Sequence, residues 1–172
     1  MSRYERLKLS RRKGNAIRQH LDMADIVRPV VIATRSGQVV LCELTENGRT
    51  LCSNLGIDPR PKPRESLEHR YWIKKAHEYF QGQGYDITRE HVISGNGAID
   101  LLAERPGERV AIEVETGKSD IAANLEKLKK AGFGRIVMIA TSPEAITACR
   151  RTVEQFRNDG SVQVEQLTWL DL

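Results

Sequence analysis

The sequence predicts an α/β protein in which helices flank a mixed central sheet, with a small second domain at the amino end. In residues 65–172, the segments follow one another in the order helix, three strands, helix, strand, helix and strand. The run Arg135–Thr141, RIVMIAT, is almost continuously apolar, as expected for a strand that is buried on both faces. Residues 58–64 carry proline at every second position, which stiffens the chain and marks a linker between the two domains.

Residues 1–57 are expected to form the smaller domain, with two helices and a hairpin. The expected helix, strand, strand and helix lie at Ser10–Met23, Val27–Thr34, Gln38–Leu44 and Thr45–Leu55. Ser10 is a candidate N-cap, and Ile17 and Leu21 are four positions apart, as on one face of a helix. Gly56 follows the last helix as a stop signal.

Positive charge is concentrated in the first domain. Residues 1–64 contain 13 Lys and Arg against 6 Asp and Glu, whereas residues 65–172 contain 14 against 17. Basic side chains in the first turn of a helix oppose its dipole, so those that follow Ser10 are expected to have another role. This division predicts a first domain that docks on a polyanion. The alternative is a small αββα cap that only packs on the rest of the chain.

The second domain is expected to contain three helices and five strands. The helices are predicted at Ser66–Gln81, Ser119–Ala131 and Pro143–Arg157, and the strands at Tyr85–Ile93, Ala98–Ala103, Arg109–Glu115, Arg135–Thr141 and Ser161–Trp169. Ser66 is a candidate N-cap, and Pro143 stands at the first helical position, where proline is tolerated. In the middle helix, Leu125 and Leu128 are expected to face inward and Lys127 outward.

Three acidic side chains interrupt two of the apolar strands. Asp100 lies within Ala98–Ala103, and Glu113 and Glu115 lie within Arg109–Glu115. Because side chains alternate along a strand, Glu113 and Glu115 point to the same face, where Asp100 meets them if the strands form a hairpin. Crowded carboxylates in apolar surroundings favour a bound cation, and oxygen ligands suit Mg²⁺ or Mn²⁺. Three acids on a solvated sheet edge are the alternative interpretation.

The helix predicted at Ser66–Gln81 contributes a fourth candidate acid. Glu68 lies in its first turn, where it is either a solvated acid stabilised by the helix dipole or a member of the acidic site. His69 and His77 lack metal-ligand spacing and are expected to be surface residues. No Ser–His–Asp or Cys–His arrangement competes with the acids, and the Walker phosphate-binding pattern is absent from the sequence.

The cysteines and the apolar runs bear on the compartment. Cys42, Cys52 and Cys149 lack the spacing of a zinc site or of a disulfide framework, which is typical of a reducing compartment. No apolar run approaches the length of a membrane span, and the charged N-terminus lacks the apolar stretch of a signal peptide. We therefore expect a cytoplasmic protein with no membrane partner.

The order of elements, with Asp on the second strand and Glu-x-Glu on the third, resembles the PD-(D/E)XK nuclease superfamily and its αβββαβ restriction-endonuclease-like core. More narrowly, SLEHRYW and AIDLLAERPGERVAIEVETGKSD resemble the restriction-endonuclease-like domain at the end of some HerA/FtsK-type ATPases and in mobile-element proteins. The resemblance covers roughly residues 65–160. It implies that Asp100 and Glu113 bind Mg²⁺ or Mn²⁺, with Glu68 as the metal-binding acid of the first helix.

The sequence departs from that family at one motif position, because Glu115 stands where the motif has Lys. Lys118, three residues further on, is expected to bring its ammonium back to the site and to orient the attacking water or stabilise the developing charge. A second cation held by Glu115 is the alternative source of positive charge. The resemblance implies a metal-dependent DNA endonuclease with Asp100, Glu113, Glu115 and Lys118 as its catalytic residues. The alternative is a catalytically inactive nuclease-fold module for DNA binding or assembly.

Residues 4–57 resemble the second half of a winged-helix domain. The phrase LTENGR at residues 44–49 is similar to the segment that follows the wing in many such domains. By this resemblance, the helix that begins at Ser10 lies in a DNA major groove and Arg35 reaches phosphate or the minor groove. The DNA-binding residues that it implies are Arg11, Arg12, Lys13, Arg18 and Arg35. DNA is therefore the expected partner, while an ATPase or helicase partner and a homodimer are left open.

Overall fold

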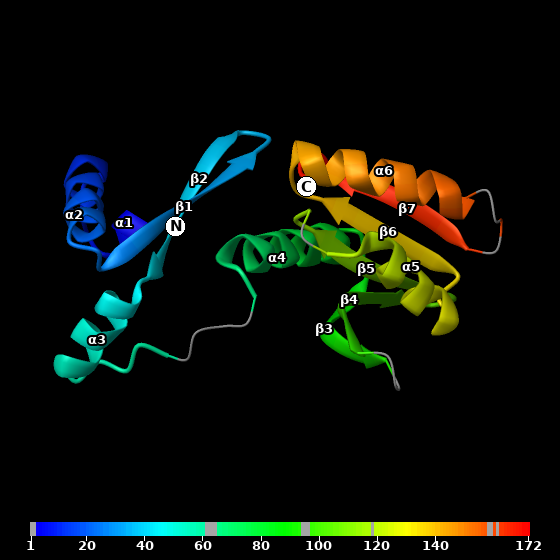
Figure 1. Ribbon diagram of the computed structural model, residues 1–172, viewed down its shortest axis with the longest axis horizontal. Coiled ribbons are helices and arrows are strands. Elements are labelled where there is room, and N and C mark those ends of the chain that lie inside the picture. Colours follow the sequence, from blue (N-terminus) through cyan, green and yellow to red (C-terminus); the bar gives the residue numbers. More distant parts are fainter. Residues whose placement is uncertain (1–2, 61–64, 94–96, 118, 158–159, 161) are drawn as a thin grey trace. The chain divides into compact units, whose positions relative to one another are not determined.

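The chain divides into two compact units, one of residues 1–33 and 37–67 and the other of residues 34–36 and 68–172. The computed structural model in Figure 1 describes residues 3–60, 65–93, 97–117, 119–157, 160 and 162–172 of the 172-residue chain. No helix within these described residues is long and apolar enough to cross a membrane.

Among the described residues, the first unit contains three helices and a two-stranded sheet. In chain order they are α1 (Arg3–Arg6), α2 (Arg11–Met23), β1 (Val27–Thr34), β2 (Gly37–Leu44) and α3 (Glu46–Asn54). The predicted order of helix, hairpin and helix is confirmed. Two hydroxyls cap the longer helices: Ser10 accepts a hydrogen bond from the Lys13 N–H at 3.3 Å. Thr45 accepts one from the Gly48 N–H at 3.0 Å.

The short helix α1 is a feature that the sequence pattern does not predict. It packs against α2 at Gly14, which is buried because the Tyr4 ring lies where a Cβ would stand. The Tyr4 hydroxyl also donates a hydrogen bond to Asn15 Oδ1 at 2.7 Å. Four residues are too few to display a helical periodicity, so only this tertiary contact reveals the helix.

The second unit is built on a five-stranded sheet with the strand order β3-β4-β5-β6-β7. Its strands are β3 (Asp86–Ile93), β4 (Gly97–Arg105), β5 (Glu108–Glu115), β6 (Arg135–Ala140) and β7 (Gln163–Thr168), and its helices are α4 (Leu67–Gly82), α5 (Ile121–Lys130) and α6 (Pro143–Arg157). The strands β3, β4 and β5 pair antiparallel, whereas β5, β6 and β7 pair parallel. The predicted α/β class and mixed central sheet are therefore confirmed.

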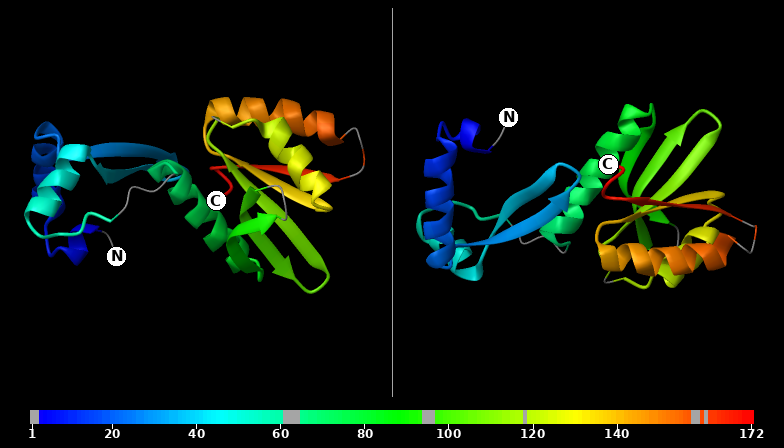
Figure 2. Two further views of the ribbon diagram at one scale, coloured as in Figure 1. Left: turned by 60° about the horizontal axis from the view of Figure 1, so that its bottom comes forward. Right: turned by 90° about the horizontal axis from the view of Figure 1, so that it is seen from above.

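Helices cover both faces of this sheet (Figure 2). On one face, α5 and α6 contribute Leu125, Leu128 and Cys149 to a core that includes Ala111 and Met138 from neighbouring strands. On the other face, α4 buries the apolar stripe Trp72, Ile73, Ala76 and Phe80. The interior strand β6, between β5 and β7, is buried from its second residue to its last, as its apolar run predicts.

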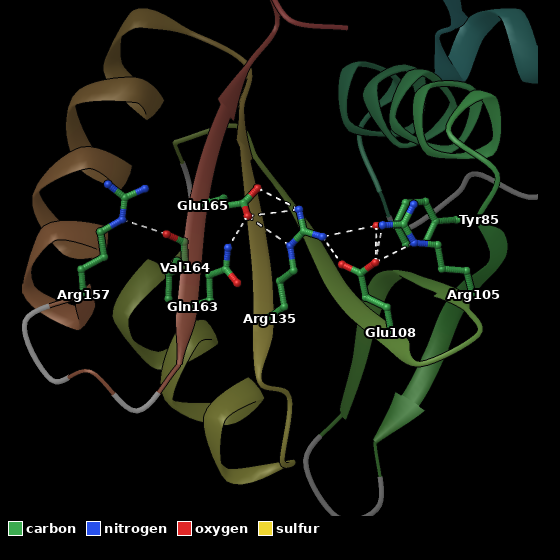
Figure 3. Close-up of polar contacts among 8 residues, drawn as sticks. All are labelled: Tyr85, Arg105, Glu108, Arg135, Arg157, Gln163, Val164 and Glu165. Carbon is green, nitrogen blue, oxygen red and sulfur yellow. Dashed lines mark hydrogen bonds and ion pairs between the residues drawn. The ribbon is translucent and has the colours of Figure 1, made fainter.

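A polar network links the strands at the end of the sheet where β5, β6 and β7 begin (Figure 3). Arg135, the first residue of β6, donates to Glu165 of β7 at 3.1 Å and forms an ion pair with Glu108 of β5. Its guanidinium also donates to the Tyr85 hydroxyl at 3.3 Å. Arg105 donates to Glu108 at 2.6 Å across the β4–β5 turn. The hydrogen bond to Glu165 and the ion pair with Glu108 raise the pKa of Arg135 above its ordinary value.

Replacing Arg135 with Met should lower the free energy of unfolding of the second unit by about 2 kcal/mol. Glu108 and Glu165 are half-buried, and they would keep their charges after losing the guanidinium that lies between them. Denaturant unfolding followed by tryptophan fluorescence measures the loss, because Trp72 and Trp169 both lie in this unit.

Arg109→Met is the matched control for this prediction. Arg109 is 60% exposed in its ion pair with Glu104, so its loss should cost less than about 1 kcal/mol. Equal losses of stability in the two variants would contradict a structural role for the Arg135 network.

Candidate functional site

The candidate site lies where β4 and β5 part. Their pairing ends at Leu101 and Ile112, beyond which β4 continues beside β3 and β5 beside β6. The carboxylate of Asp100 stands at this opening, where its Oδ2 accepts a hydrogen bond from the Val114 N–H at 2.8 Å. This bond holds the Asp100 carboxylate against β5, and 16% of the Asp100 side chain is exposed.

Glu113 forms an ion pair with Lys127, which the helical periodicity predicts to face solvent. The carboxylate is 6% exposed, and its Oε1 lies 3.1 Å from the ammonium of Lys127 on α5. Lys127 also donates to the carbonyl of Ala98 at 3.0 Å. The prediction that Lys127 faces outward is therefore wrong. A long aliphatic stem lets a lysine leave a helix face and carry its charge to a buried acid.

Glu115 is the most deeply buried of the three acids, with 1% exposure. The Ser119 hydroxyl and the Asn124 side-chain amide, the latter at 3.0 Å, both donate hydrogen bonds to its carboxylate. The side chain of Asp120 caps α5 nearby by accepting from the Ala123 N–H at 3.0 Å. The start of α5 thus holds Glu115 in place by hydrogen bonds.

Burial and mutual repulsion shift the pKa values of these acids. Burial, together with the negative charge of Asp100, raises the pKa of Glu113 to about 7, although Lys127 opposes the shift. Burial likewise raises the pKa of Glu115, and the hydrogen bond from Asn124 opposes it. Two buried carboxylates whose ionised forms are disfavoured make an environment that a bound cation would stabilise.

Replacing Glu113 with Gln should stabilise the metal-free protein at pH 8 but not at pH 5. A folded-state pKa above the unfolded value favours folding while the acid is protonated, and that contribution disappears as the pH rises through about 7. The variant should gain up to about 3 kcal/mol over the parent at pH 8, since each pKa unit corresponds to about 1.4 kcal/mol. Urea unfolding in EDTA at both pH values measures the difference.

Glu126→Gln, on the exposed side of α5, is the matched control and should leave stability unchanged at both pH values. If Glu113→Gln raises the free energy of unfolding equally at pH 5 and pH 8, the ionised carboxylate is not the cause of the gain in stability.

His69 joins Asp100 at the opening. Its Nε2 lies 3.2 Å from Asp100 Oδ2, and 18% of its side chain is exposed, so the prediction that it is a surface residue is wrong. Among the described residues, Glu65, His69 and Asp100 each offer a metal-ligand atom, and these atoms lie within 4.8 Å of one another. Glu65 lies two residues before α4 begins, so helical spacing does not predict that it approaches His69.

This group does not include the predicted site residues Glu68, Glu113 and Glu115. Glu68 occupies the first turn of α4 and does not belong to the group formed by its neighbour His69. Its role as a metal-binding acid stays a prediction. Lys118 lies outside the described residues, so its approach to the acids also stays a prediction.

The predicted DNA-binding residues lie on one helix of the first unit and on the turn that joins β1 and β2. Arg11, Arg12 and Lys13 form the exposed first turn of α2, and Arg18 is half-buried further along the same helix. Arg35 is exposed in the turn between β1 and β2. Their contact with DNA stays a prediction.

No family model matches the chain, and no curated protein matches it. A solved structure, described as "Crystal Structure of Protein of Unknown Function AF1548", matches with a TM-score of 0.40 and 17% sequence identity. The match covers 56% of this chain and 56% of that one, so it spans about half the length of either protein. The functional interpretation therefore rests on the site itself.

Proposed function

We propose that this protein is a metal-dependent DNA endonuclease of the PD-(D/E)XK type, which hydrolyses phosphodiester bonds. The observation that carries the proposal is the opening between β4 and β5. There the Asp100 carboxylate accepts a hydrogen bond from the Val114 N–H, and the ammonium of Lys127 lies beside the buried carboxylate of Glu113. Acids and a cation held together in a partly water-excluded site suit the stabilisation of a phosphate undergoing in-line attack.

The carboxylates at the opening suit a hard divalent cation. Asp100 and Glu113 supply oxygen ligands of the kind that Mg²⁺ and Mn²⁺ prefer, and the repulsion between the two acids favours a cation between them. When bound, the cation supplies activation of the attacking water and positive charge for the phosphate oxygens. Glu115, held by Ser119 and Asn124, orients the end of β5 from which Glu113 projects.

Lys127 is the residue that we propose in place of the motif lysine. Glu115 occupies the motif position, and Lys127 approaches the same acids from α5, with its ammonium 3.1 Å from Glu113. From there it is placed to stabilise negative charge that develops on the phosphate. Lys118 remains the second candidate for this role, on the strength of its sequence position alone.

Incubation with plasmid and branched DNA tests the proposed function. Cleavage is expected with Mg²⁺ or Mn²⁺ and none with EDTA. A protein that binds duplex DNA without cleaving it under any of these conditions would instead be the inactive nuclease-fold module, an alternative that Glu115 at the lysine position favours. An ATPase or helicase partner and a homodimer are further proposals that rest on the family resemblance.

The first unit should supply most of the duplex affinity. Replacing Arg11, Arg12 and Lys13 together with Ala should weaken duplex binding at least tenfold at ~100 mM salt. The dependence of log K on log salt should become shallower by up to about 3, because each lost phosphate contact releases one counterion fewer. Fluorescence anisotropy over a salt series measures both quantities.

The matched control neutralises three exposed basic residues of the second unit, Lys74, Lys130 and Arg151. This control carries the same change of net charge, so it separates local docking from general attraction. If the control loses as much affinity as the α2 variant, docking through the first unit is ruled out.

A further inference from the structure

We propose that His69 Nε2 is a ligand of the metal, so that the site combines nitrogen and oxygen donors and selects Mn²⁺ over Mg²⁺. The inference rests on the proposed metal-dependent function. It extends that function by naming a ligand that neither the acidic pattern nor the motif contains.

The spacing of His69 and Asp100 fits two ligands of one ion. Two donor atoms that share one ion at about 2.1 Å each lie about 3 Å apart in octahedral coordination. The Nε2 of His69 and the Oδ2 of Asp100 are 3.2 Å apart, and both side chains are partly exposed toward the same opening. α4 therefore delivers an imidazole where the motif would place an acid from the same helix.

The charges at the opening favour an ion over a plain hydrogen bond. Asp100, Glu113 and Glu115 bring three carboxylates to this end of the sheet, and within the described part of the chain Lys127 forms an ion pair with Glu113. A neutral imidazole that donates to Asp100 brings no positive charge to these carboxylates. A divalent ion held by His69 and Asp100 would bring two positive charges to them.

The donor set decides which ion is preferred. Mg²⁺ prefers oxygen ligands and retains its waters, whereas imidazole nitrogen suits first-row transition ions. Among those ions, Mn²⁺ is the one that also favours carboxylate and water oxygen. Coordination through Nε2 requires the proton to sit on Nδ1 of the ring. His69 would thus raise the affinity for Mn²⁺ and add little to the affinity for Mg²⁺.

Mn²⁺ binding to the full chain tests the proposal without any measurement of cleavage. Titration followed by the loss of the free Mn²⁺ EPR signal, and calorimetry for Mg²⁺, should give Mn²⁺ at least a tenfold lower Kd. Pulsed EPR of the bound Mn²⁺ should display coupling to a ¹⁴N nucleus. His69→Gln should abolish this coupling and weaken Mn²⁺ binding about tenfold, with little change for Mg²⁺.

Two further variants keep the test decisive. His77→Gln, two turns along α4, is the matched control and should retain both the coupling and the affinity. His69→Asp makes the donors all oxygen and should narrow the difference between Mn²⁺ and Mg²⁺. Bound Mn²⁺ without nitrogen coupling in the parent protein would overturn the role of His69 and leave the nuclease proposal standing. No binding of either ion at millimolar concentration would overturn both.

Discussion

Asp100→Asn and Glu113→Gln should each abolish DNA cleavage while the second unit stays folded. Both carboxylates are proposed to hold the metal, and an amide cannot replace the charge that binds it and orients the attacking water. Single-turnover rates with saturating Mn²⁺ should fall at least ~1,000-fold, the upper range for losing a major stabilising group. Thermal unfolding in EDTA should be unchanged or raised, since each substitution removes one of two carboxylates that repel one another.

Asp86→Asn is the matched control for the Asp100 variant. Asp86 is an exposed residue at the start of β3, in the same sheet, and its loss should leave cleavage intact. Calorimetric titration with Mn²⁺ should show weakened binding in the Asp100 and Glu113 variants and parent-like binding in the control. Full cleavage by either site variant would remove the proposed site.

Lys127→Met should slow cleavage at least ~100-fold while DNA and metal binding persist. The ammonium is proposed to stabilise charge that appears only as the phosphate reacts, so its loss should lower the single-turnover rate and leave affinity nearly unchanged. Lys127→Arg should restore part of the rate, because the charge returns to the same place. Lys130→Met, on the same helix but exposed, is the matched control and should cleave normally.

Lys118 is the alternative to Lys127 as the cation that stabilises the reacting phosphate. If Lys118→Ala is slowed at least ~100-fold and Lys127→Met is not, the motif lysine has moved only three residues along the chain, and Lys127 serves to hold Glu113. If neither variant is slowed by more than a few-fold, positive charge comes from a second metal ion at Glu115. Rates measured at several Mn²⁺ concentrations distinguish that case, since two ions give a steeper dependence than one.

Local patterns determined most of the elements. Ser10 starts α2, Pro143 starts α6, and the apolar run at Arg135 gives β6, because caps, proline and burial act within a few neighbouring residues. The alternation along β5 likewise placed Glu113 and Glu115 on one face before any tertiary information. These features depend on spacing along the chain, which the sequence contains in full.

The composition of the site was decided by the tertiary structure. Helical periodicity assigned Lys127 to solvent, and His69 was expected at the surface because it lacks the spacing of a metal ligand. Both side chains nevertheless reach the acids at the end of the sheet. Helical periodicity specifies which residues face the core, but it does not specify where a helix end lies relative to strands far away in sequence. The strand order brings Asp100 of β4 and Glu113 of β5 to one opening, and α4 and α5 are packed so that polar side chains reach it. Long side chains at that opening lose contacts with water and gain hydrogen bonds and ion pairs with buried groups. Those groups come together only in the assembled sheet.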